Sequence, residues 1–378
     1  MNLSPESFYK GSVYSDSESI ETAVRRMETE GADIIDVGAA SSAPVNIYAT
    51  SPISGELEAS RIEEAFPRIR QLTELPISID TTSSRVARIA LDLGADMVND
   101  VSGLRDDPEM ALLIADRGVP VVIMSRCSPP CHSLNQALEA LCESIRIAGD
   151  AGIHDDRIIV DPGIGFGKPA AVDLDLVKSL GSFKMLGYPL LVGLSRKAFL
   201  GSIACSSSPD ERLTETIAAT AISVAYGADI VRSHDVAEAR KAVRVGAALA
   251  THSHLTSGSV ELVDALDEQE ASVLLKRIGV SPEVVPALSK KCSTLNVLVS
   301  GVTPSAGVVM KQEMLAVGGD AAYHHGTIDH SVDCTDVLVM GNRLQLSKLA
   351  KRLLKMTYFG LDRIGREIAD VLDVHIQK

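Results

Sequence analysis

The chain has no tryptophan, and only 3% of its 378 residues are aromatic, so its core must be largely aliphatic. Basic residues are fewer than acidic ones: the chain has 36 Lys and Arg and 50 Asp and Glu, which gives a formal charge of -14. This balance argues against a general nucleic-acid or anionic-membrane surface, which needs an excess of cationic side chains. No signal peptide stands before Asn2, and no apolar stretch reaches the roughly 20 residues of a membrane span. We therefore expect a cytoplasmic globular protein that binds neither nucleic acid nor membrane.

Cysteine is scarce as well, with six residues scattered along the chain. Only Cys127 and Cys131 lie close together, in a segment that continues into His132. A single short cluster lacks the second half that tetrahedral zinc sites usually show, so a metal ion here is the less favoured alternative. The sequence instead predicts reduced thiols, as is usual for cytosolic proteins.

Between Ala32 and about Val245 the sequence alternates regularly. Seven short apolar runs are separated by segments with helical spacing, of which residues 84–93 and 214–225 are each closely followed by a glycine that suits a helix C-cap. This alternation predicts a parallel sheet with right-handed crossovers, covered by helices. The runs are ADIIDVG, PISID, ADMVND, PVVIMS, RIIVDPG, PLLVGLS and ADIVRSHD.

Seven parallel strands could form an open doubly wound sheet or a nearly complete barrel. Residues 1–3 are apolar enough to be the stump of an eighth strand, which favours the barrel. The strands also end in polar or ionisable residues, as they do at the catalytic face of a barrel, whereas an open sheet gathers its site at one switch point. We therefore predict an α/β protein with a (β/α)8 (TIM) barrel. The strand-end residues are Asn2, Asp36, Asp80, Asn99 with Asp100, Ser125, Asp161, Ser195 to Lys197, and Arg232 to His234.

After Val245 the pattern changes to a helix end and a connection rich in Ser, Thr and His. We place a barrel domain at residues 1–250 and a smaller α/β domain at residues 259–378. The smaller domain has a helix start at Ser281, the apolar runs LNVLVSGV and DVLVMG, and two basic helices, residues 345–355 and 361–372.

Three strand ends offer the groups that a flat heterocycle with an aminopyrimidinone edge requires, which are paired acceptors and an amide at a fixed height. They are Asp80, Asn99 and Asp161. Helix capping is the alternative for Asp80 and for Asp100, and it suits Asp100 better, so Asp100 is left out of the site.

Asp161 also opens the segment DPGIGFGK, whose three glycines would let the backbone turn tightly and approach such a ligand. The alternative is an ordinary tight turn that ends in a solvent-facing lysine, Lys168, since glycine-rich segments are common.

Cationic and amide side chains gather after the last two runs, in Ser195-Arg196-Lys197 and Arg232-Ser233-His234-Asp235. Together with Asn2 they would form one rim able to bind a pyrophosphate leaving group, because arginine contacts phosphate with two donors and histidine or lysine stabilises developing charge. Surface ion pairing with nearby acids is the alternative for either cluster.

Seven segments in order give residues 1 to about 245 a resemblance to dihydropteroate synthases: NLSPESF, DVGAASSAP, ISIDT, NDVSG, DPGIGFGK, GLSRKAFLG and RSHDV. The resemblance implies a (β/α)8 barrel, usually a homodimer, that joins a dihydropterin-methyl pyrophosphate to p-aminobenzoate with loss of pyrophosphate and help from Mg2+. It also implies a role for each matching residue. Pterin contacts would come from Asp80, Asn99, Asp161, Phe166 and Lys197, catalytic contacts from Lys197, Arg232 and His234, a metal contact from Asn2, and the arylamine loop from Ser41, Ser42 and Pro44.

The chain departs from this pattern on the side that would receive the arylamine. Ala43 stands where the family's second loop has an arginine, Ala40 replaces an acid upstream of it, and Ala198 replaces a serine after the lysine. Lys10 replaces the acid that ends the first loop. The pterin side is intact, so pterin binding is the firmer expectation, and an arylamine of the kind used for methanopterin-type cofactors is an alternative to p-aminobenzoate.

Two further alternatives concern the reaction itself. One is a pterin-dependent methyltransferase, but a methyl donor brings no diphosphate, and the retained Lys197, Arg232 and His234 favour the synthase. The other is a noncatalytic pterin-binding homologue, since a fold does not fix a function. Residues 310–341 resemble an accessory module attached to some bacterial dihydropteroate synthases, and this resemblance implies no role for it.

Overall fold

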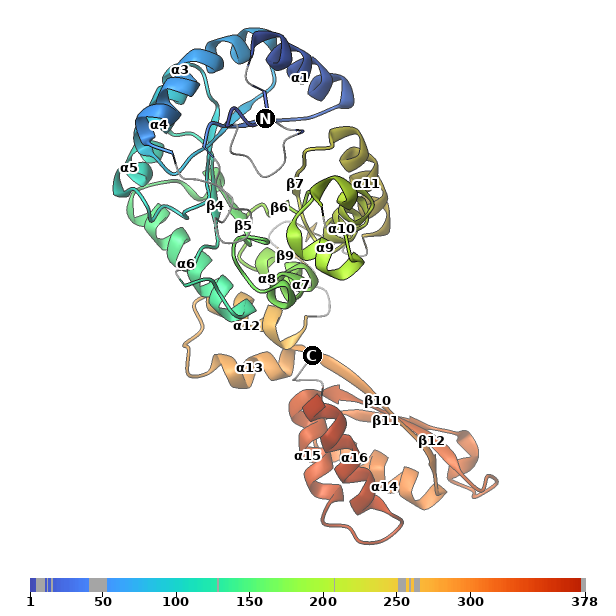
Figure 1. The fold of residues 1–378 in the computed structure, drawn as a ribbon. Coiled ribbons are helices and arrows are strands. Elements are labelled where there is room, and N and C mark those ends of the chain that lie inside the picture. Colours follow the sequence, from blue (N-terminus) through green and yellow to red (C-terminus); the bar gives the residue numbers. More distant parts are fainter. Residues whose placement is uncertain are drawn as a thin grey trace. The chain divides into compact units, whose positions relative to one another are not determined.

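The computed structural model describes residues 1–4, 11, 13–14, 16–40, 53–127, 129–206, 208–250, 256–257, 260–261 and 266–374. The chain divides into two compact units, Met1–Ser253 and His254–Lys378 (Figure 1). None of the helices in the described parts combines the length and apolar character of a membrane span.

The first unit is built on parallel strands that correspond to the seven apolar runs. Strands β1 to β5 form one sheet in sequence order, β6 pairs with β7, and a bridge between Val160 and Leu190 joins the two groups. Asn2 pairs in parallel with Gly38, so the predicted stump takes the eighth strand position. The (β/α)8 barrel is thereby confirmed. The strands are β1 (Ile35–Gly38), β2 (Ile77–Asp80), β3 (Met97–Asp100), β4 (Val121–Met124), β5 (Ile158–Asp161), β6 (Leu191–Gly193) and β7 (Ile230–Arg232).

Helices surround these strands (Figure 1). The predicted helices at 84–93 and 214–225 are α4 and α10, and Gly94 and Gly227 follow them with the left-handed φ of 99° and 109° that helix ends favour. Arg240 of α11 donates to the carbonyl of Gly31, which ends α1, so the last helix contacts the first. The helices are α1 (Ser17–Glu30), α3 (Gly55–Leu72), α4 (Ser84–Asp92), α5 (Pro108–Arg117), α6 (Leu134–Asp150), α7 (Ala170–Lys178), α8 (Leu180–Lys184), α9 (Ala198–Ala204), α10 (Leu213–Ala225) and α11 (Val236–Leu249).

The barrel core consists mainly of aliphatic side chains, as the scarcity of aromatic residues predicts, and Phe66 and Phe183 are fully buried aromatic members of it. Every residue of β2, β3 and β4 is buried, because helices cover one face of these strands and barrel side chains fill the other. Most polar side chains of these strands, apart from Ser78, therefore lie at the carboxyl ends.

The second unit is an antiparallel sheet in the order β10-β12-β11, with helices packed on it. The two apolar runs form β10 and β12, and burial alternates along β12 as expected for a strand with one covered face. Its core includes Met310, Val337, Val339 and Leu346. The elements are α12 (Glu268–Arg277), α13 (Val285–Cys292), β10 (Thr294–Val302), α14 (Pro304–Ala316), β11 (Asp320–Tyr323), β12 (Thr335–Asn342), α15 (Arg343–Leu353) and α16 (Leu361–Val374), and a short pair, β8 (Thr256–Ser257) and β9 (Val260–Glu261), precedes them.

The predicted helix start at Ser281 is wrong by several residues. The chain first makes a turn in which the carbonyl of Ser281 accepts from the N–H of Val284, and α13 begins at Val285. The reason is Pro286, which has no N–H to donate and is tolerated in the first turn of a helix.

Candidate active site

The ends of four neighbouring strands form one row. Asn2 pairs with Gly38, Gly38 with Asp80, and Asp80 with Asn99. Because these strands are parallel, their carboxyl ends lie on the same side of the barrel. Backbone pairing alone therefore brings three of the predicted site residues, Asn2, Asp80 and Asn99, next to one another.

Arg232 lies at the end of β7, the last strand of the barrel, and its side chain reaches the row formed by the first strands. Its Nε donates to Oδ2 of Asp36 at 2.6 Å, and its Nη2 donates to Oδ2 of Asp80 at 2.9 Å. The amide of Asn99 donates to the same oxygen of Asp36 at 3.4 Å. The two carboxylates are largely buried, with 18% and 7% of their side chains exposed. One guanidinium thus links β7 to β1 and β2.

Asp36 and Asp80 differ in charge state although they share this arginine. Burial raises the pKa of Asp80 to about 7, and the nearby Asp36 and Glu58 add to the rise, while Arg232 opposes it. For Asp36, burial also favours a higher pKa, but Arg232 and further hydrogen bonds outweigh it and the pKa lies below its ordinary value. Asp36 is therefore the constant counter-charge of Arg232, and Asp80 is the carboxyl whose protonation responds to pH near neutrality.

The segment DPGIGFGK forms the tight loop that the sequence predicts, here called the glycine loop (residues 163–168). Gly163, Gly165 and Gly167 have φ of 69°, 80° and 79°, a left-handed backbone that favours glycine. The N–H of Gly163 donates to Oδ1 of Asp161 at 2.7 Å, and the N–H of Gly165 donates to Oδ1 of Asp173 at 2.8 Å. Two carboxylates therefore fix the course of the loop.

The alternative of a solvent-facing Lys168 is wrong. The residue is 5% exposed, and its Nζ donates to the carbonyls of Gly163 at 2.6 Å and Ser125 at 3.4 Å. Burial lowers the pKa of Lys168, while Asp173 and Asp161 raise it. The side chain folds back beneath the loop because these carbonyls and carboxylates compensate its charge there.

Lys197, which follows β6, reaches the same loop. Its Nζ donates to the carbonyl of Ile164 and lies 4.7 Å from the centre of the Phe166 ring. Gly165 has to lack a side chain, because a Cβ there would collide with the stem of Lys197. Burial lowers the pKa of Lys197 to about 8, although Asp161 raises it. The structure thus brings the predicted Asp161, Phe166 and Lys197 together.

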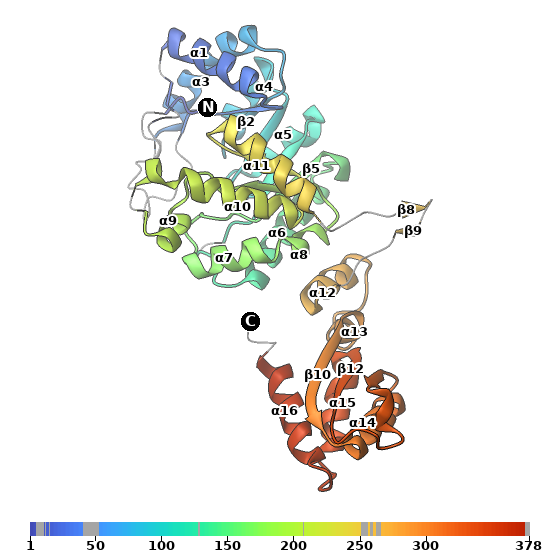
Figure 2. The same ribbon diagram turned by 90° about the vertical axis from the view of Figure 1, so that its right-hand side faces the viewer.

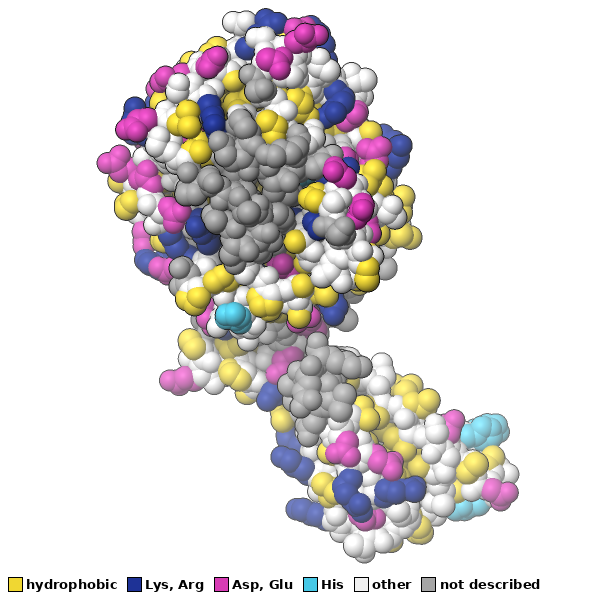
Figure 3. Space-filling model, viewed as in Figure 1, with side chains coloured by type: hydrophobic (Ala, Val, Ile, Leu, Met, Phe, Trp, Pro, Cys, Tyr) yellow, Lys and Arg dark blue, Asp and Glu magenta, His cyan; other side chains and the backbone are white. Residues whose placement is uncertain are grey.

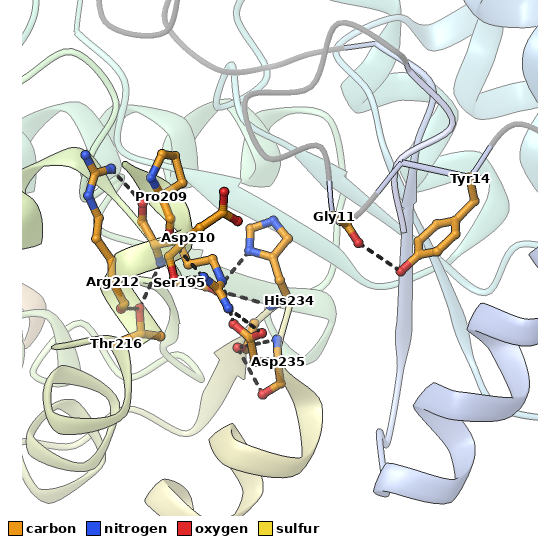
Figure 4. Close-up of polar contacts among 11 residues, drawn as sticks. Gly11, Tyr14, Ser195, Pro209, Asp210, Arg212, Thr216, His234 and Asp235 are labelled. Carbon is orange, nitrogen blue, oxygen red and sulfur yellow. Dashed lines mark hydrogen bonds and ion pairs between the residues drawn. The ribbon is translucent and has the colours of Figure 1, made fainter. Parts of the chain in front are cut away.

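His234 is held by Ser195 at the rim (Figure 4). Its Nδ1 lies 2.8 Å from Oγ of Ser195, and its backbone N–H donates to the same oxygen at 3.2 Å. Burial, followed by the charge of Arg232, lowers the pKa of His234 well below its ordinary value. The imidazole is therefore neutral at physiological pH.

Arg196 is not the rim donor that its position in the sequence suggests. Its guanidinium makes two hydrogen bonds of 2.9 Å to Asp235 and two more to the carbonyls of Pro209 and Asp210 (Figure 4). The alternative of surface ion pairing is also inaccurate, because the two side chains are only 7% and 18% exposed. The pair is a buried cross-link between the segments that carry Ser195 and His234. Of the predicted rim cations in the described part of the chain, Arg232 and Lys197 remain for the site.

Sequence reasoning left two contributors out of the site. Asp36 and Ser195 end their strands in the same way as the chosen residues, and this position was the signal that could have included them. Asp100 was omitted as a cap of the following helix, and that role is wrong, because the N-cap of α5 is Asp107. The carboxylate of Asp100 instead accepts from the N–H groups of Ser102 and Leu104 in the turn after β3. The predicted arylamine-loop residues Ser41, Ser42 and Pro44 lie outside the described residues.

The expectation of reduced thiols at Cys127 and Cys131 is contradicted. The two residues form a disulfide, and their Cα atoms are 5.3 Å apart, within the range that a disulfide spans. Among the described residues no group of three or more His, Cys, Asp and Glu side chains could hold a metal ion.

Comparisons with known proteins agree with this fold. The family model described as pterin binding enzyme matches residues 1–234, so the chain belongs to the pterin-binding enzyme family. Within this family its relatives are dihydropteroate synthases, and the chain is a transferase of that type.

The similarity spans the barrel unit. The dihydropteroate synthase of Clostridium beijerinckii is 38% identical over 248 residues, which are 65% of this chain and 90% of the relative. That of Bacillus subtilis is 37% identical over 238 residues, 62% of this chain and 82% of the relative. Among solved structures, a Coxiella burnetii dihydropteroate synthase in complex with pteroic acid has 33% identity and a TM-score of 0.61 over 66% of this chain and 91% of that one. The Xanthomonas albilineans enzyme in complex with 7,8-dihydropteroate has 34% identity and a TM-score of 0.58 over 67% and 92%.

Proposed function

We propose that the protein is a dihydropteroate synthase that condenses 6-hydroxymethyl-7,8-dihydropterin pyrophosphate with p-aminobenzoate or a related arylamine and releases pyrophosphate. The observation that carries the proposal is the row of Asn2, Asp80 and Asn99 beside Arg232. Oδ1 of Asp80 is buried and accepts no hydrogen bond from any residue that the structure describes. Buried acceptors are normally paired, and the N–H groups of an aminopyrimidinone ring would supply the missing donor.

Pterin recognition is assigned to Asp80, Asn99, Asp161, Phe166 and Lys197. The two carboxylates accept from the ring, the amide of Asn99 both donates and accepts, and Lys197 donates. The Phe166 ring adds an apolar surface for a flat heterocycle. The support for this assignment is that the five side chains come from three strand ends, the glycine loop and the segment after β6, and that they lie on one side of the barrel.

Catalysis is assigned to Lys197, Arg232 and His234, which would stabilise the leaving diphosphate. The C–O bond between the pterin methylene and the diphosphate breaks, and its electron pair goes to the diphosphate. The arylamine nitrogen then forms the C–N bond to the methylene carbon and loses a proton. Cationic donors that are fixed before the reaction favour the charge that develops on the diphosphate, and the step requires no protein nucleophile.

Ser195 would select the tautomer of His234 for this role. Its Oγ accepts from the backbone N–H of His234, so its own proton is directed at Nδ1. The proton of the neutral imidazole is then on Nε2, where it can be donated to a phosphate oxygen.

A magnesium ion would be held by the side-chain oxygen of Asn2 together with diphosphate oxygens, and it would neutralise part of the charge on the leaving group. The donor set fits this ion, because Mg2+ takes oxygen ligands and is usually bound through one or two protein groups plus substrate phosphates. A complete cage of protein ligands is not needed for such a site.

The arylamine side is the half in which the chain departs from the family pattern, and Ala40 and Ala198 belong to it. Neither offers a polar side chain for the carboxylate of p-aminobenzoate, which supports a related arylamine as the second substrate. The experiment that tests the function is incubation of the purified protein with dihydropterin pyrophosphate, Mg2+ and a panel of arylamines while pyrophosphate release is followed. We expect release that depends on both substrates.

Other results of the same experiment would identify other functions. Tight binding of a methylated pterin without pyrophosphate release would indicate a pterin-dependent methyltransferase. Binding of dihydropterin pyrophosphate with no turnover for any arylamine would indicate a noncatalytic pterin-binding protein.

We further propose that the protein is a homodimer that works in the cytoplasm on small soluble substrates. Helices α10 and α11 pack closely at Gly246, where a Cβ would collide with Ala221, and Figure 2 shows them side by side on the outside of the first unit. Large apolar side chains on and beside these helices are exposed, and a second copy of the chain would bury them. They are Ile222 (47% exposed), Tyr226 (45%), Val245 (53%) and Leu249 (67%). On the face of this unit in Figure 3, acidic and basic side chains are interspersed, which suits neither nucleic acid nor a membrane as partner. Sedimentation of the protein should give twice the mass of one chain.

For the domains we propose residues 1–250 as the catalytic domain and residues 259–378 as a separate accessory domain. The support is the division of the chain into two compact units between Ser253 and His254.

A further inference from the structure

The connection between β4 and α6 contains a pair of cysteines that the proposed mechanism does not use. Cys127 and Cys131 are joined by a disulfide. Cys131 is 1% exposed, whereas Cys127 is half-buried and accessible to a small molecule. The bridge lies just after the carboxyl end of β4, and β4 pairs with β5, the strand that leads into the glycine loop.

The bridged segment packs directly on the glycine loop. Pro130, between the two cysteines, fills the space beside Gly167, since a Cβ at Gly167 would lie 3.3 Å from its Cγ. At the start of the loop, a Cβ at Gly163 would collide with the carbonyl of Ser125, two residues before Cys127. Lys168 also joins the glycine loop to Ser125, because its Nζ donates to the carbonyls of both Gly163 and Ser125. The glycine loop therefore packs against Pro130 inside the bridge and against Ser125 just before it.

The glycine loop in turn positions Lys197. Nζ of Lys197 donates to the carbonyl of Ile164 and lies over the ring of Phe166, and both residues belong to this loop. A shift of the loop would therefore move Phe166 and Lys197, two of the side chains assigned to pterin recognition.

We propose that Cys127 and Cys131 are a redox modification site that sets the affinity of the barrel for pterin, an inference that rests on the proposed function. The co-reactant is a dithiol. Its thiolate attacks Sγ of Cys127, the more exposed sulfur, and forms a mixed disulfide while Cys131 leaves as a thiolate. The second thiol of the reductant then displaces Cys127. Two electrons and two protons pass to the cysteine pair, which becomes two thiols, and the reductant becomes a disulfide.

The bridge acts by limiting the conformations of the segment that supports the glycine loop. A disulfide restricts the chain that it closes, whereas in the reduced protein noncovalent contacts alone hold Pro130 against Gly167. The apparent affinity for a ligand falls with the fraction of the protein that is in the binding-competent state. We expect reduction to weaken pterin binding about tenfold.

The test is calorimetric titration of the full chain with dihydropterin pyrophosphate, without arylamine, before and after treatment with dithiothreitol. Thiol titration of the unfolded protein defines the two states, because four of the six cysteines titrate when the bridge is intact and all six titrate after reduction. The expected result is a dissociation constant about tenfold higher in the reduced state, which returns to its first value on reoxidation.

Two variants separate the bridge from general effects of the reductant. Cys127→Ser changes the more exposed partner and should bind pterin about as weakly as the reduced protein, with or without dithiothreitol. Cys292→Ser makes the same chemical change at an exposed cysteine of the second unit and should behave as the unchanged protein. Equal dissociation constants in both redox states, or six titratable thiols in the oxidised protein, would overturn the inference. Absence of pterin binding in both states would instead contradict the proposed function.

Discussion

The two halves of the site differ in how firmly the chain holds them. On the pterin side, Asp36, Asp80 and Arg232 belong to three different strands and are joined by hydrogen bonds of 2.6 and 2.9 Å. On the arylamine side, the described residues Ala40 and Ala198 carry methyl side chains, which offer a substrate neither a donor nor an acceptor. A change on the pterin side therefore disturbs several elements, whereas a change on the arylamine side alters one contact with the substrate.

This difference indicates that the pterin-binding residues are fixed by the fold, whereas the residues on the arylamine side can vary. The pterin side depends on strand register and on buried charges that compensate one another, and such networks lose much more than one contact when a member is removed. The arylamine side is free to change with the second substrate. Variants should therefore give large effects on the first side and small ones on the second.

The largest effect is expected for Asp80→Asn. The amide brings N–H donors to a position that needs acceptors for the pterin and for Nη2 of Arg232, so kcat/KM for dihydropterin pyrophosphate should fall about 1000-fold. Asp100→Asn is the matched control, because it changes the next buried strand-end carboxylate, which bonds only to its own turn. Comparable losses in the two variants, measured by pyrophosphate release, would remove the distinction between site and structure.

Arg232→Lys should cost about 100-fold in kcat/KM, since an ammonium group cannot reach Asp36 and Asp80 with two fixed donors. Arg240→Lys provides the comparison on the following helix, where the arginine donates to the carbonyl of Gly31. Steady-state kinetics of both variants should show the loss in the first alone. An Arg232→Lys enzyme of normal activity would mean that the bridge between the strands is unimportant.

The pH dependence of kcat/KM should be bell-shaped. Below a pH of about 7, Asp80 takes up a proton and loses its function as acceptor, so the rate falls as the pH drops. Above about 8, Lys197 loses its proton and its positive charge, so the rate falls as the pH rises. Lys197→Arg tests the second limb, because arginine keeps its charge and the decline above pH 8 should disappear. Persistence of that decline would assign it to the substrate.

The smallest effect is expected for Ala198→Ser, which adds a hydroxyl on the arylamine side. The new hydroxyl can donate to the carboxylate of p-aminobenzoate. KM for p-aminobenzoate should therefore fall about threefold, while KM for the pterin stays the same. Ala204→Ser, at the other end of α9, serves as the control. A change in the pterin KM alone would contradict the division of the site into two halves.

The barrel could be predicted because its signals are local. Apart from Ser78, the positions of β2 and β3 before the strand ends are apolar, and Asp80 and Asn99 follow them as visible polar residues. Strand order then follows from chain order in a parallel barrel, which brings these residues together.

Other features depend on contacts between side chains that are far apart in the chain. Residue types and their spacing do not reveal such contacts. Arg196 and Arg232 look equivalent as cations after a strand, yet one is used in a buried pair with Asp235 and the other faces the site. Lys168 was judged by the exposure usual for lysine, but the carbonyls that bury it belong to a different segment of the chain. The disulfide depends on the fold of the segment after β4, which spacing alone does not specify.

The central claim is that Asp80, Asn99, Asp161 and Lys197 hold the pterin at the carboxyl ends of the strands. A crystal structure of the protein grown with 6-hydroxymethylpterin tests it most directly. We expect density for the bicyclic ring with its aminopyrimidinone edge on the carboxylates of Asp80 and Asp161 and the amide of Asn99. Density for the ring at any other place on the barrel, with these side chains unchanged and unliganded, would contradict it.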